Sequence, residues 1–251
     1  MPLTQQQLDF FNDNGYLRIG RILEAAEIEL LRREYDHEFA KANDDGSFRN
    51  LSENDTADLE KKRGGKLKML QIMQMCERNI HFRKLIYDAR ILDLVQDLIG
   101  PNIMLFHDQA LFKPARTGGA VFWHQDNAYW KCRPASLVSC WLTLDDATRE
   151  NGAMQVIPGS HRKPMWHPVS EQTNALLDLK DQVDVSKAVV VDLPAGSIMF
   201  HHCQTLHYTQ PNATDIQRRA FAVHFMTPGT RFESGEAQKV GFAKPMLRMS
   251  I

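Results

Sequence analysis

Apolar residues in the first hundred positions recur mainly at helical spacing. The expected helices are residues 4–14, which begin at a capping Thr4, residues 23–42, and the stretch from 81 to the Gly100-Pro101 stop. Residues 43–68 are polar and include the basic cluster KKRGGKLK, which is typical of a mobile loop. The pattern therefore predicts a mainly helical N-terminal part over residues 1–100, with a mobile loop near 43–68.

After residue 100 the chain changes to short β-type runs separated by glycine, proline and asparagine. The expected strands are residues 103–113, 137–144, 154–158, 188–193 and 218–227. Because no long helix intervenes between most of them, an antiparallel sandwich or barrel is favoured over a parallel sheet. We expect one domain over 1–251, in which the helices pack on a β core at 101–230 and 231–251 form a C-terminal tail.

The composition narrows the possible functions. Thirty basic and thirty-one acidic side chains give a formal charge of -1, without the cationic excess of a nucleic-acid-binding protein. No apolar run is long enough for a membrane span, and the first residues lack the order of a secretion signal. Four scattered cysteines without a CxxC pair fit reduced, buried thiols. We therefore expect a cytoplasmic protein with no nucleic-acid or membrane partner.

Histidine is distributed unevenly, because eight of the ten histidines lie beyond residue 100. The sequence VFWHQDNAYW places His124 two positions before Asp126, and residues i and i+2 of a strand point to the same face. Both side chains would then reach one metal ion, with Gln125 turned to the other face. Random placement of this composition gives about 0.8 such His-x-Asp triplets, so the motif alone is weak.

A third ligand would complete the two-histidine, one-carboxylate triad that holds non-haem ferrous iron with one side open. His201, His202 and His207 compete for this role in the stretch FHHCQTLHYTQPN. The sequence contains no GxGxxG, GxxxxGK[ST], GxSxG or HExxH, the usual motifs for nucleotide binding, serine hydrolysis and zincin proteolysis. A metal site is therefore the main chemical hypothesis.

Arg218 gives this hypothesis a second element. Alternation along the last expected strand places Arg218 on one face with two alanines and His224, and Arg219 on the other face with three large apolar residues. The alanines leave room for a ligand, so Arg218 is expected to point into a cavity. If 2-oxoglutarate chelates the metal, the Arg218 guanidinium and the Thr209 hydroxyl suit its far carboxylate. The competing interpretation is a surface ion pair.

Five stretches carry a resemblance to a known family. They are LTQQQLDFFNDNGYL, GPNIMLFHDQALFKP, GGAVFWHQDNAYW, CWLTLDDATRENGAMQVIPGSH, and FHHCQTLHYTQPN followed by RRAFAVHF. In order and spacing, from about residue 3 to 227, they resemble the phytanoyl-CoA dioxygenase (PhyH) family of iron(II)/2-oxoglutarate-dependent oxygenases. The resemblance implies a mainly β fold, a double-stranded β-helix (jelly roll, cupin-like), with N-terminal helices packed on it.

The resemblance also implies roles for individual residues. It implies that His124, Asp126 and His207 bind iron and that Arg218 binds the far carboxylate of 2-oxoglutarate. Three further positions match residues around the cosubstrate with less weight, namely Thr209, Gln109 and Trp141. For these, packing within the barrel is the competing interpretation.

The implied activity is an Fe(II)/2-oxoglutarate-dependent dioxygenase that uses O2 and hydroxylates an unactivated C–H bond of a small-molecule substrate, releasing succinate and CO2. An intact Asp126 favours hydroxylation, desaturation or cyclisation over halogenation, because related halogenases have a small residue there. Two alternatives are a cupin-like metal oxygenase that does not use 2-oxoglutarate and a non-catalytic sensor of metal or 2-oxoglutarate. The sequence leaves the substrate and the oligomeric state open.

Overall fold

The computed structural model describes residues 2–51, 68–168, 179, 182–233 and 244–250. Its helices are α1 (Gln5–Asn14), α2 (Ala25–Asp45), α4 (Met75–Arg78), α5 (Ile80–Ile86), α6 (Ala89–Ile99) and α7 (Asp126–Trp130). Its strands are β1 (Tyr16–Arg21), β2 (Arg49–Asn50), β3 (Leu70–Met73), β4 (Ile103–Lys113), β5 (Val121–His124), β6 (Cys132–Arg133), β7 (Val138–Thr143), β8 (Met154–Val156), β9 (Val189–Val191), β10 (Ser197–His202), β11 (His207–Thr209), β12 (Arg218–Met226), β13 (Arg231–Phe232) and β14 (Met246–Arg248). Short 3-10 helices lie at Arg149–Asn151, Ser160–Arg162 and Val185–Lys187.

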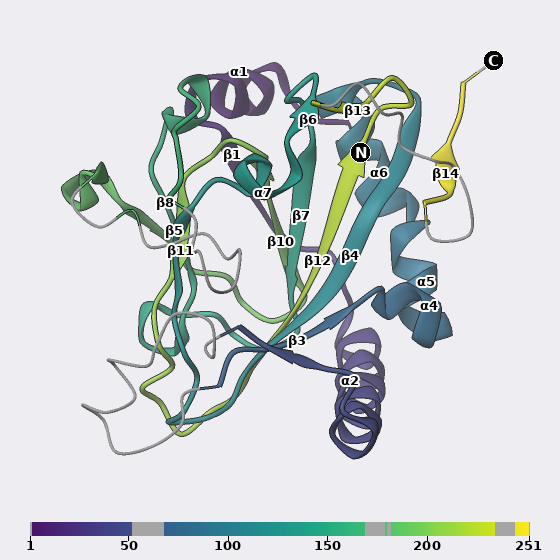
Figure 1. Cartoon of the computed structure of the whole chain (residues 1–251). Helices are drawn as coiled ribbons and strands as arrows, with labels where there is room; N and C mark the ends of the chain where they lie inside the picture. The colour runs from purple at the N-terminus through teal and green to yellow at the C-terminus, as the bar shows by residue number, and fades with distance from the viewer. Residues whose placement is uncertain (1, 52–67, 169–178, 180–181, 234–243, 251) are drawn as a thin grey trace.

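Two antiparallel sheets face each other (Figure 1). The large sheet has the order β1-β10-β7-β12-β4-β3-β2, with β14 also paired to β4, and the small sheet has the order β5-β11-β8-β9. From β4 to β12 the chain crosses repeatedly between the two sheets. This crossing order is that of a jelly roll, so the expected double-stranded β-helix is confirmed.

The main hydrophobic core lies between the large sheet and the helices, which cover its outer face (Figure 1). Alternation along β12 directs Phe221, Val223 and Phe225 into this core. Tyr35 of α2 is fully buried there and donates a hydrogen bond to the Ala220 carbonyl oxygen at 3.3 Å. The opposite face of β12 looks into the space between the sheets, where a second apolar cluster includes Trp141 and Ala222.

The N-terminal helices agree with the sequence, with two differences. Thr4 caps α1 through a capping box with Gln7, as predicted, and α2 runs three residues beyond the expected end at residue 42. The stretch from 81 to 99 is not one helix: α5 ends at Ile86, and α6 begins anew behind Asp88, whose side chain accepts a hydrogen bond from the Arg90 backbone N–H. An aspartate favours such a helix start.

The strands agree well where they are long. Residues 103–113 form β4 as predicted, and the four other expected runs contain β7, β8, β9 and β12. Sequence patterns did not reveal β1, β2 and β3, which extend the large sheet from within the supposedly helical part. They also missed β13 and β14 in the expected tail. Of the predicted mobile loop, 52–67 lie outside the described residues, 43–45 belong to α2, and Arg49–Asn50 form β2.

Arg219 anchors the end of β12 to the helical layer. Its guanidinium donates to both carboxylate oxygens of Asp145, at 2.9 and 2.7 Å, and its Nη1 donates to Asp36 of α2 at 2.8 Å. Asp145 is buried and also accepts from the Arg219 backbone N–H. Sequence alternation correctly separated Arg219 from Arg218, and the structure shows that Arg219 has a structural ion pair.

We expect Asp145→Ala to lower the free energy of unfolding by about 3–5 kcal/mol, because it removes the buried carboxylate that accepts two side-chain hydrogen bonds from Arg219 and leaves this buried charge with the half-exposed Asp36 alone. The measurement is urea unfolding followed by circular dichroism. Glu29→Ala removes an exposed carboxylate that pairs with Arg32 at 2.6 Å, and this control should cost no more than about 1 kcal/mol. Equal effects of the two substitutions would contradict the anchoring role of Asp145.

Candidate metal centre and active site

Three predicted metal ligands converge between the sheets. His124 ends β5 and His207 begins β11, and the register of these paired strands places the two residues directly opposite each other. The Asp126 Oδ1 atom lies 3.6 Å from His124 Nε2 and 3.7 Å from His207 Nε2. Among the histidine, cysteine and acidic side chains that the structure describes, these three are placed so that they could hold one metal ion. The donor set is that of non-haem iron(II).

The expected reason for the His-x-Asp convergence was wrong. β5 ends at His124, and Asp126 is the first residue of the short helix α7, not a strand residue. Gln125 does turn away, because its side chain donates to the carbonyl oxygens of Lys163 and Gln204. The change from strand to helix therefore brings both ligand side chains to the same point.

Backbone carbonyls set the orientation of both histidine rings. His124 Nδ1 lies 2.7 Å from the Phe122 carbonyl oxygen, and His207 Nδ1 lies 3.0 Å from the Thr205 carbonyl oxygen. A carbonyl only accepts, so each Nδ1 carries the proton and each Nε2 presents its lone pair toward Asp126. Both rings are thus held in the tautomer that binds a metal through Nε2.

The two carboxylate oxygens of Asp126 have different neighbours. Oδ1 faces His124 and His207, whereas Oδ2 lies 3.1 Å from His201 Nε2 and 3.3 Å from Ser139 Oγ. Burial acts to raise the pKa of Asp126, but the surrounding histidines outweigh it and hold this pKa well below its usual range. Asp126 is therefore an anion with one oxygen directed at the metal position.

Arg218 is a buried cation. Only 1% of its surface is exposed, and it forms no salt bridge with the described residues. Its Nη1 donates to the Leu111 carbonyl oxygen at 3.2 Å, and its guanidinium lies 5.5 Å from the centre of the Trp141 ring. Among the described residues, neither its Nε nor the buried Oγ1 of Thr209 has a hydrogen-bond partner. Burial lowers the pKa of Arg218 to about 10, which still leaves it charged at neutral pH.

These groups share one pocket of about 460 Å³, a typical size for a small-molecule site. All seven residues predicted for the site line this pocket, namely Gln109, His124, Asp126, Trp141, His207, Thr209 and Arg218. Gln109 lies among polar neighbours, with its Nε2 2.9 Å from His224 Nε2 and its Oε1 accepting from Gln71. Unpaired Arg218 Nε and Thr209 Oγ1 fit a carboxylate such as that of 2-oxoglutarate.

Aromatic residues beside the metal ligands form part of the pocket wall. Tyr129 and Trp130 of α7 line the pocket. Phe106, Lys113, Asn127 and His167 are not among the lining residues. Lys113, for example, is fully buried and donates to three backbone carbonyl oxygens, of Gly119, Thr209 and Gln210.

Sequence reasoning missed three residues around the site. It considered His201 only as a competitor for the third ligand position, although His201 lines the pocket and contacts Asp126. It assigned no role to Ser139, which is two positions before Trp141 and therefore on the same face of β7. Gln71 lies on β3, a strand that the sequence pattern did not reveal. Alternation from Trp141 offered a signal for Ser139, whereas Gln71 had none.

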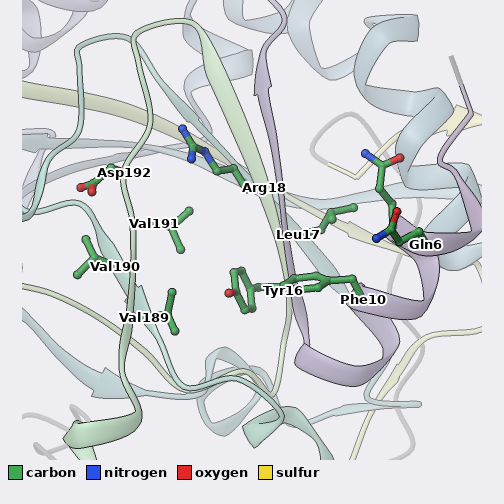
Figure 2. A pocket seen from close by; sticks show the side chains of 10 residues that line it. Gln6, Phe10, Tyr16, Leu17, Arg18, Val189, Val190, Val191 and Asp192 are labelled. Carbon is green, nitrogen blue, oxygen red and sulfur yellow. The ribbon is translucent and has the colours of Figure 1, made fainter.

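A second hollow of about 440 Å³ lies at the open side of the barrel, between α1, β1 and β9. Figure 2 shows Tyr16 projecting from β1 toward the valines of β9, with Phe10 of α1 beside it. Its lining is mainly apolar and includes Arg18 and Asp192 at its edge. It shares no lining residue with the metal pocket and contains none of the predicted site residues.

Comparison with family models identifies the chain. The model described as Phytanoyl-CoA dioxygenase (PhyH) matches residues 11–220. The chain belongs to the PhyH family. The match spans the predicted metal ligands and Arg218, and the family resemblance seen in the sequence is confirmed. This PhyH protein is a 2-oxoglutarate-dependent oxygenase with iron and 2-oxoglutarate as its cofactors.

Individual relatives agree with this assignment. A probable alpha-ketoglutarate-dependent hypophosphite dioxygenase of Stutzerimonas stutzeri is 27% identical over 231 residues, covering 88% of this PhyH chain and 78% of the relative. The peroxisomal phytanoyl-CoA dioxygenase of Homo sapiens is 27% identical and covers 96% and 76%. The structure of the epimerase SnoN in complex with Fe3+, alpha ketoglutarate and nogalamycin RO has a TM-score of 0.78 at 20% identity, covering 97% and 98%, and shares the fold.

Two further expectations for this PhyH protein concern its cysteines and the possibility of a membrane-spanning helix. The four cysteines are all free and buried, as the absence of a pairing pattern predicted. Within the described ranges, no helix combines the length and the apolar character needed to cross a bilayer.

Buried histidines should make the metal-free PhyH protein sensitive to acid. Burial lowers the pKa of His107 and of His202 to about 4 and that of His207 to about 3, against about 6.5 in an unfolded chain. Between pH 6.5 and 4 the unfolded state therefore binds more protons than the folded state. We therefore expect the free energy of unfolding to decrease as the pH is lowered through this window. The decrease is up to about 1.4 kcal/mol for each pH unit and each such histidine.

Urea unfolding at pH 7, 6 and 5 measures this dependence. His107→Phe should reduce the slope, whereas His37→Ala, which removes an exposed histidine of α2, should leave it unchanged. A free energy of unfolding that stays constant or rises from pH 7 to pH 5 would contradict the expectation.

Proposed function

We propose that the protein binds Fe(II) through His124, Asp126 and His207, binds 2-oxoglutarate through Arg218, and hydroxylates a C–H bond of a small molecule. One observation carries the proposal. A pocket that contains two histidines and a carboxylate in metal-binding order also contains a fully buried guanidinium, which has no anionic partner within the described part of the chain. The two histidines and the carboxylate suit a metal cation. The guanidinium suits the far carboxylate of a cosubstrate that chelates this metal at its other end.

At the metal, His124 and His207 offer Nε2, and Asp126 offers Oδ1. Iron with 2-oxoglutarate and O2 supplies the oxidising power for hydroxylation, with succinate and CO2 as co-products. The chain holds the ligand geometry through the two Nδ1 hydrogen bonds to backbone carbonyls and the contacts to Asp126 Oδ2. An aspartate in this position leaves no place for a halide ligand, which favours hydroxylation, desaturation or cyclisation over halogenation.

At the other end, Arg218 binds the far carboxylate of 2-oxoglutarate with help from Thr209. Each carries a buried polar atom, Arg218 Nε or Thr209 Oγ1, that no described residue pairs with, and an unpaired buried donor is costly. Trp141 supports the guanidinium from one face, and Gln109 lies on the adjacent wall. This clamp favours a 2-oxoglutarate enzyme over a cupin-like oxygenase that needs no carboxylate site.

The substrate is a neutral or anionic small molecule in this proposal. Asp126 is the only carboxylate among the described lining residues, whereas Arg49 at the rim is exposed and basic. Tyr129 and Trp130 supply aromatic surface beside the metal ligands. Relatives are named for substrates as different as hypophosphite and ectoine, so these wall residues set the choice of substrate. The free, buried cysteines favour work in the reducing cytoplasm.

Anaerobic addition of Fe(II) and 2-oxoglutarate to the purified protein should produce the visible charge-transfer band of the chelated complex. His124→Ala and Asp126→Ala should lose this band, because each removes a ligand. His37→Ala, an exposed histidine on α2, serves as the matched control and should retain it. Full iron-dependent 2-oxoglutarate turnover by Asp126→Ala would show that the ligand assignment is wrong.

Arg218→Met should weaken 2-oxoglutarate binding by roughly tenfold to a hundredfold, because a charge-assisted hydrogen bond contributes about 1.5–3 kcal/mol. Thr209→Val should have a smaller effect of about fivefold. Titration of 2-oxoglutarate into the Fe(II)-loaded protein measures both. Arg116→Met removes an exposed arginine paired with Asp215 and should leave the affinity unchanged. Unaltered affinity in Arg218→Met would exclude Arg218 from the cosubstrate site.

A further inference from the structure

A row of polar side chains crosses the large sheet beside the metal site. Five neighbouring strands, β10, β7, β12, β4 and β3, contribute one residue each. These residues are His201, Ser139, His224, Gln109 and Gln71. The strand register places Ser139 directly opposite His201 on one side and His224 on the other. Gln109 is opposite Ala222 and Met73, and is therefore diagonal to His224 and Gln71.

The row forms a continuous chain of hydrogen bonds. Gln71 Nε2 donates to Gln109 Oε1, and Gln109 Nε2 lies 2.9 Å from His224 Nε2. His224 Nδ1 lies 2.7 Å from Ser139 Oγ, which in turn lies 3.3 Å from Asp126 Oδ2. Ser139 and His224 are almost completely buried, so water does not compete for these contacts.

The chemistry of the groups fixes the direction of the chain. An amide nitrogen only donates, so Gln109 Nε2 makes His224 Nε2 an acceptor. Burial holds the pKa of His224 well below its usual range, so the ring is neutral and its single proton lies on Nδ1. Nδ1–H then donates to Ser139 Oγ, and the serine hydroxyl is left to donate to Asp126 Oδ2.

We propose that His224 is a positioning residue for the iron ligand Asp126, acting through Ser139, with its tautomer set from the pocket wall by Gln109 and Gln71. The proposal rests on the proposed iron site. It adds a role to residues that touch neither the metal position nor Arg218.

The relay determines which oxygen of Asp126 meets the metal. Ser139 Oγ and His201 Nε2 both donate to Oδ2, and these two bonds leave Oδ1 toward His124 and His207. Without the serine hydroxyl the carboxylate has one donor fewer and can rotate about its Cβ–Cγ bond. Partners that orient a metal ligand typically change metal affinity tenfold to a hundredfold when they are removed.

The far end of the relay lies in the pocket wall. Gln71 is 92% buried, and its Oε1 has no partner among the described residues, although the residue lines the pocket. A substrate N–H or O–H group that reaches this oxygen pairs the last free acceptor of the row. The relay thus links the wall that receives the substrate to the carboxylate that holds the metal.

The first test measures anaerobic Fe(II) binding to the full-length protein. Ser139→Ala and His224→Phe should each weaken Fe(II) binding by tenfold or more. Ser197→Ala is the matched control, because Ser197 is an equally buried serine on β10 whose hydroxyl pairs with no described residue, and the Fe(II) affinity of this variant should stay within twofold of wild type. Ser139→Ala and His224→Phe interrupt the same chain of hydrogen bonds. The double variant should therefore bind Fe(II) no more than about twofold more weakly than the single variant with the lower affinity.

Conservative replacement separates positioning from simple packing. His224→Gln retains a donor and an acceptor, so it should bind Fe(II) more tightly than His224→Phe. The proposal is overturned if Ser139→Ala binds Fe(II) with wild-type affinity or if Ser197→Ala loses as much affinity as Ser139→Ala. It is also overturned if the losses add in the double variant, or if His224→Gln binds Fe(II) no more tightly than His224→Phe.

The second test needs no iron. Nitrogen NMR of the metal-free protein with labelled histidine distinguishes the two tautomers, and the spectrum of His224→Phe assigns the His224 signals by their absence. We expect the proton on Nδ1, and a proton on Nε2 would overturn the relay. If the wild-type protein forms no complex with Fe(II) and 2-oxoglutarate, the proposed function fails instead, and the tautomer still reports on the relay.

Discussion

Among the residues that the structure describes, the barrel buries two charges that no aspartate, glutamate, lysine or arginine side chain neutralises. Asp126 is an anion surrounded by three imidazoles and a hydroxyl, whereas Arg218 is a cation that meets a backbone carbonyl and the face of Trp141. Each buried ion costs several kcal/mol unless a partner compensates for the lost hydration. The two charges lie in one pocket without an ion pair between them. The pocket therefore selects a ligand set with a cation at one end and an anion at the other.

The jelly roll makes this separation possible because its two sheets divide the task. The small sheet and the helix that follows β5 supply the predicted metal ligands, and β12 of the large sheet supplies Arg218. On the outer face of the large sheet, Phe221, Val223 and Phe225 of β12 pack against the helical layer. The inner face is thus left for polar groups. Charged and polar side chains thus stand on strands that are fixed from behind by a well-packed core.

Sequence reasoning succeeded where one short-range pattern decided the outcome. Alternation along β12 correctly predicted that Arg218 points toward the pocket and Arg219 away from it. The prediction was possible because β12 is buried on both faces, so that a shift of one residue would exchange the two faces. The same reasoning failed at Asp126, because a strand-to-helix change between positions 124 and 126 leaves no mark in hydrophobic periodicity. Strands of two to six residues, such as β1, β2 and β3, are likewise too short for a periodic pattern among helices.

The polar row depends on strand pairing between distant parts of the chain, so no local pattern predicts it. Gln71, Ser139 and His224 come together only because β3, β4, β12 and β7 are neighbours in the sheet. The same limit applied to the choice between His201 and His207, which composition could not separate. The structure separates them by the oxygen of Asp126 that each faces: His207 lies near Oδ1, and His201 contacts Oδ2. One carboxylate thus distinguishes the two histidines, because the predicted metal ligand His207 faces Oδ1 and the hydrogen-bond donor His201 faces Oδ2.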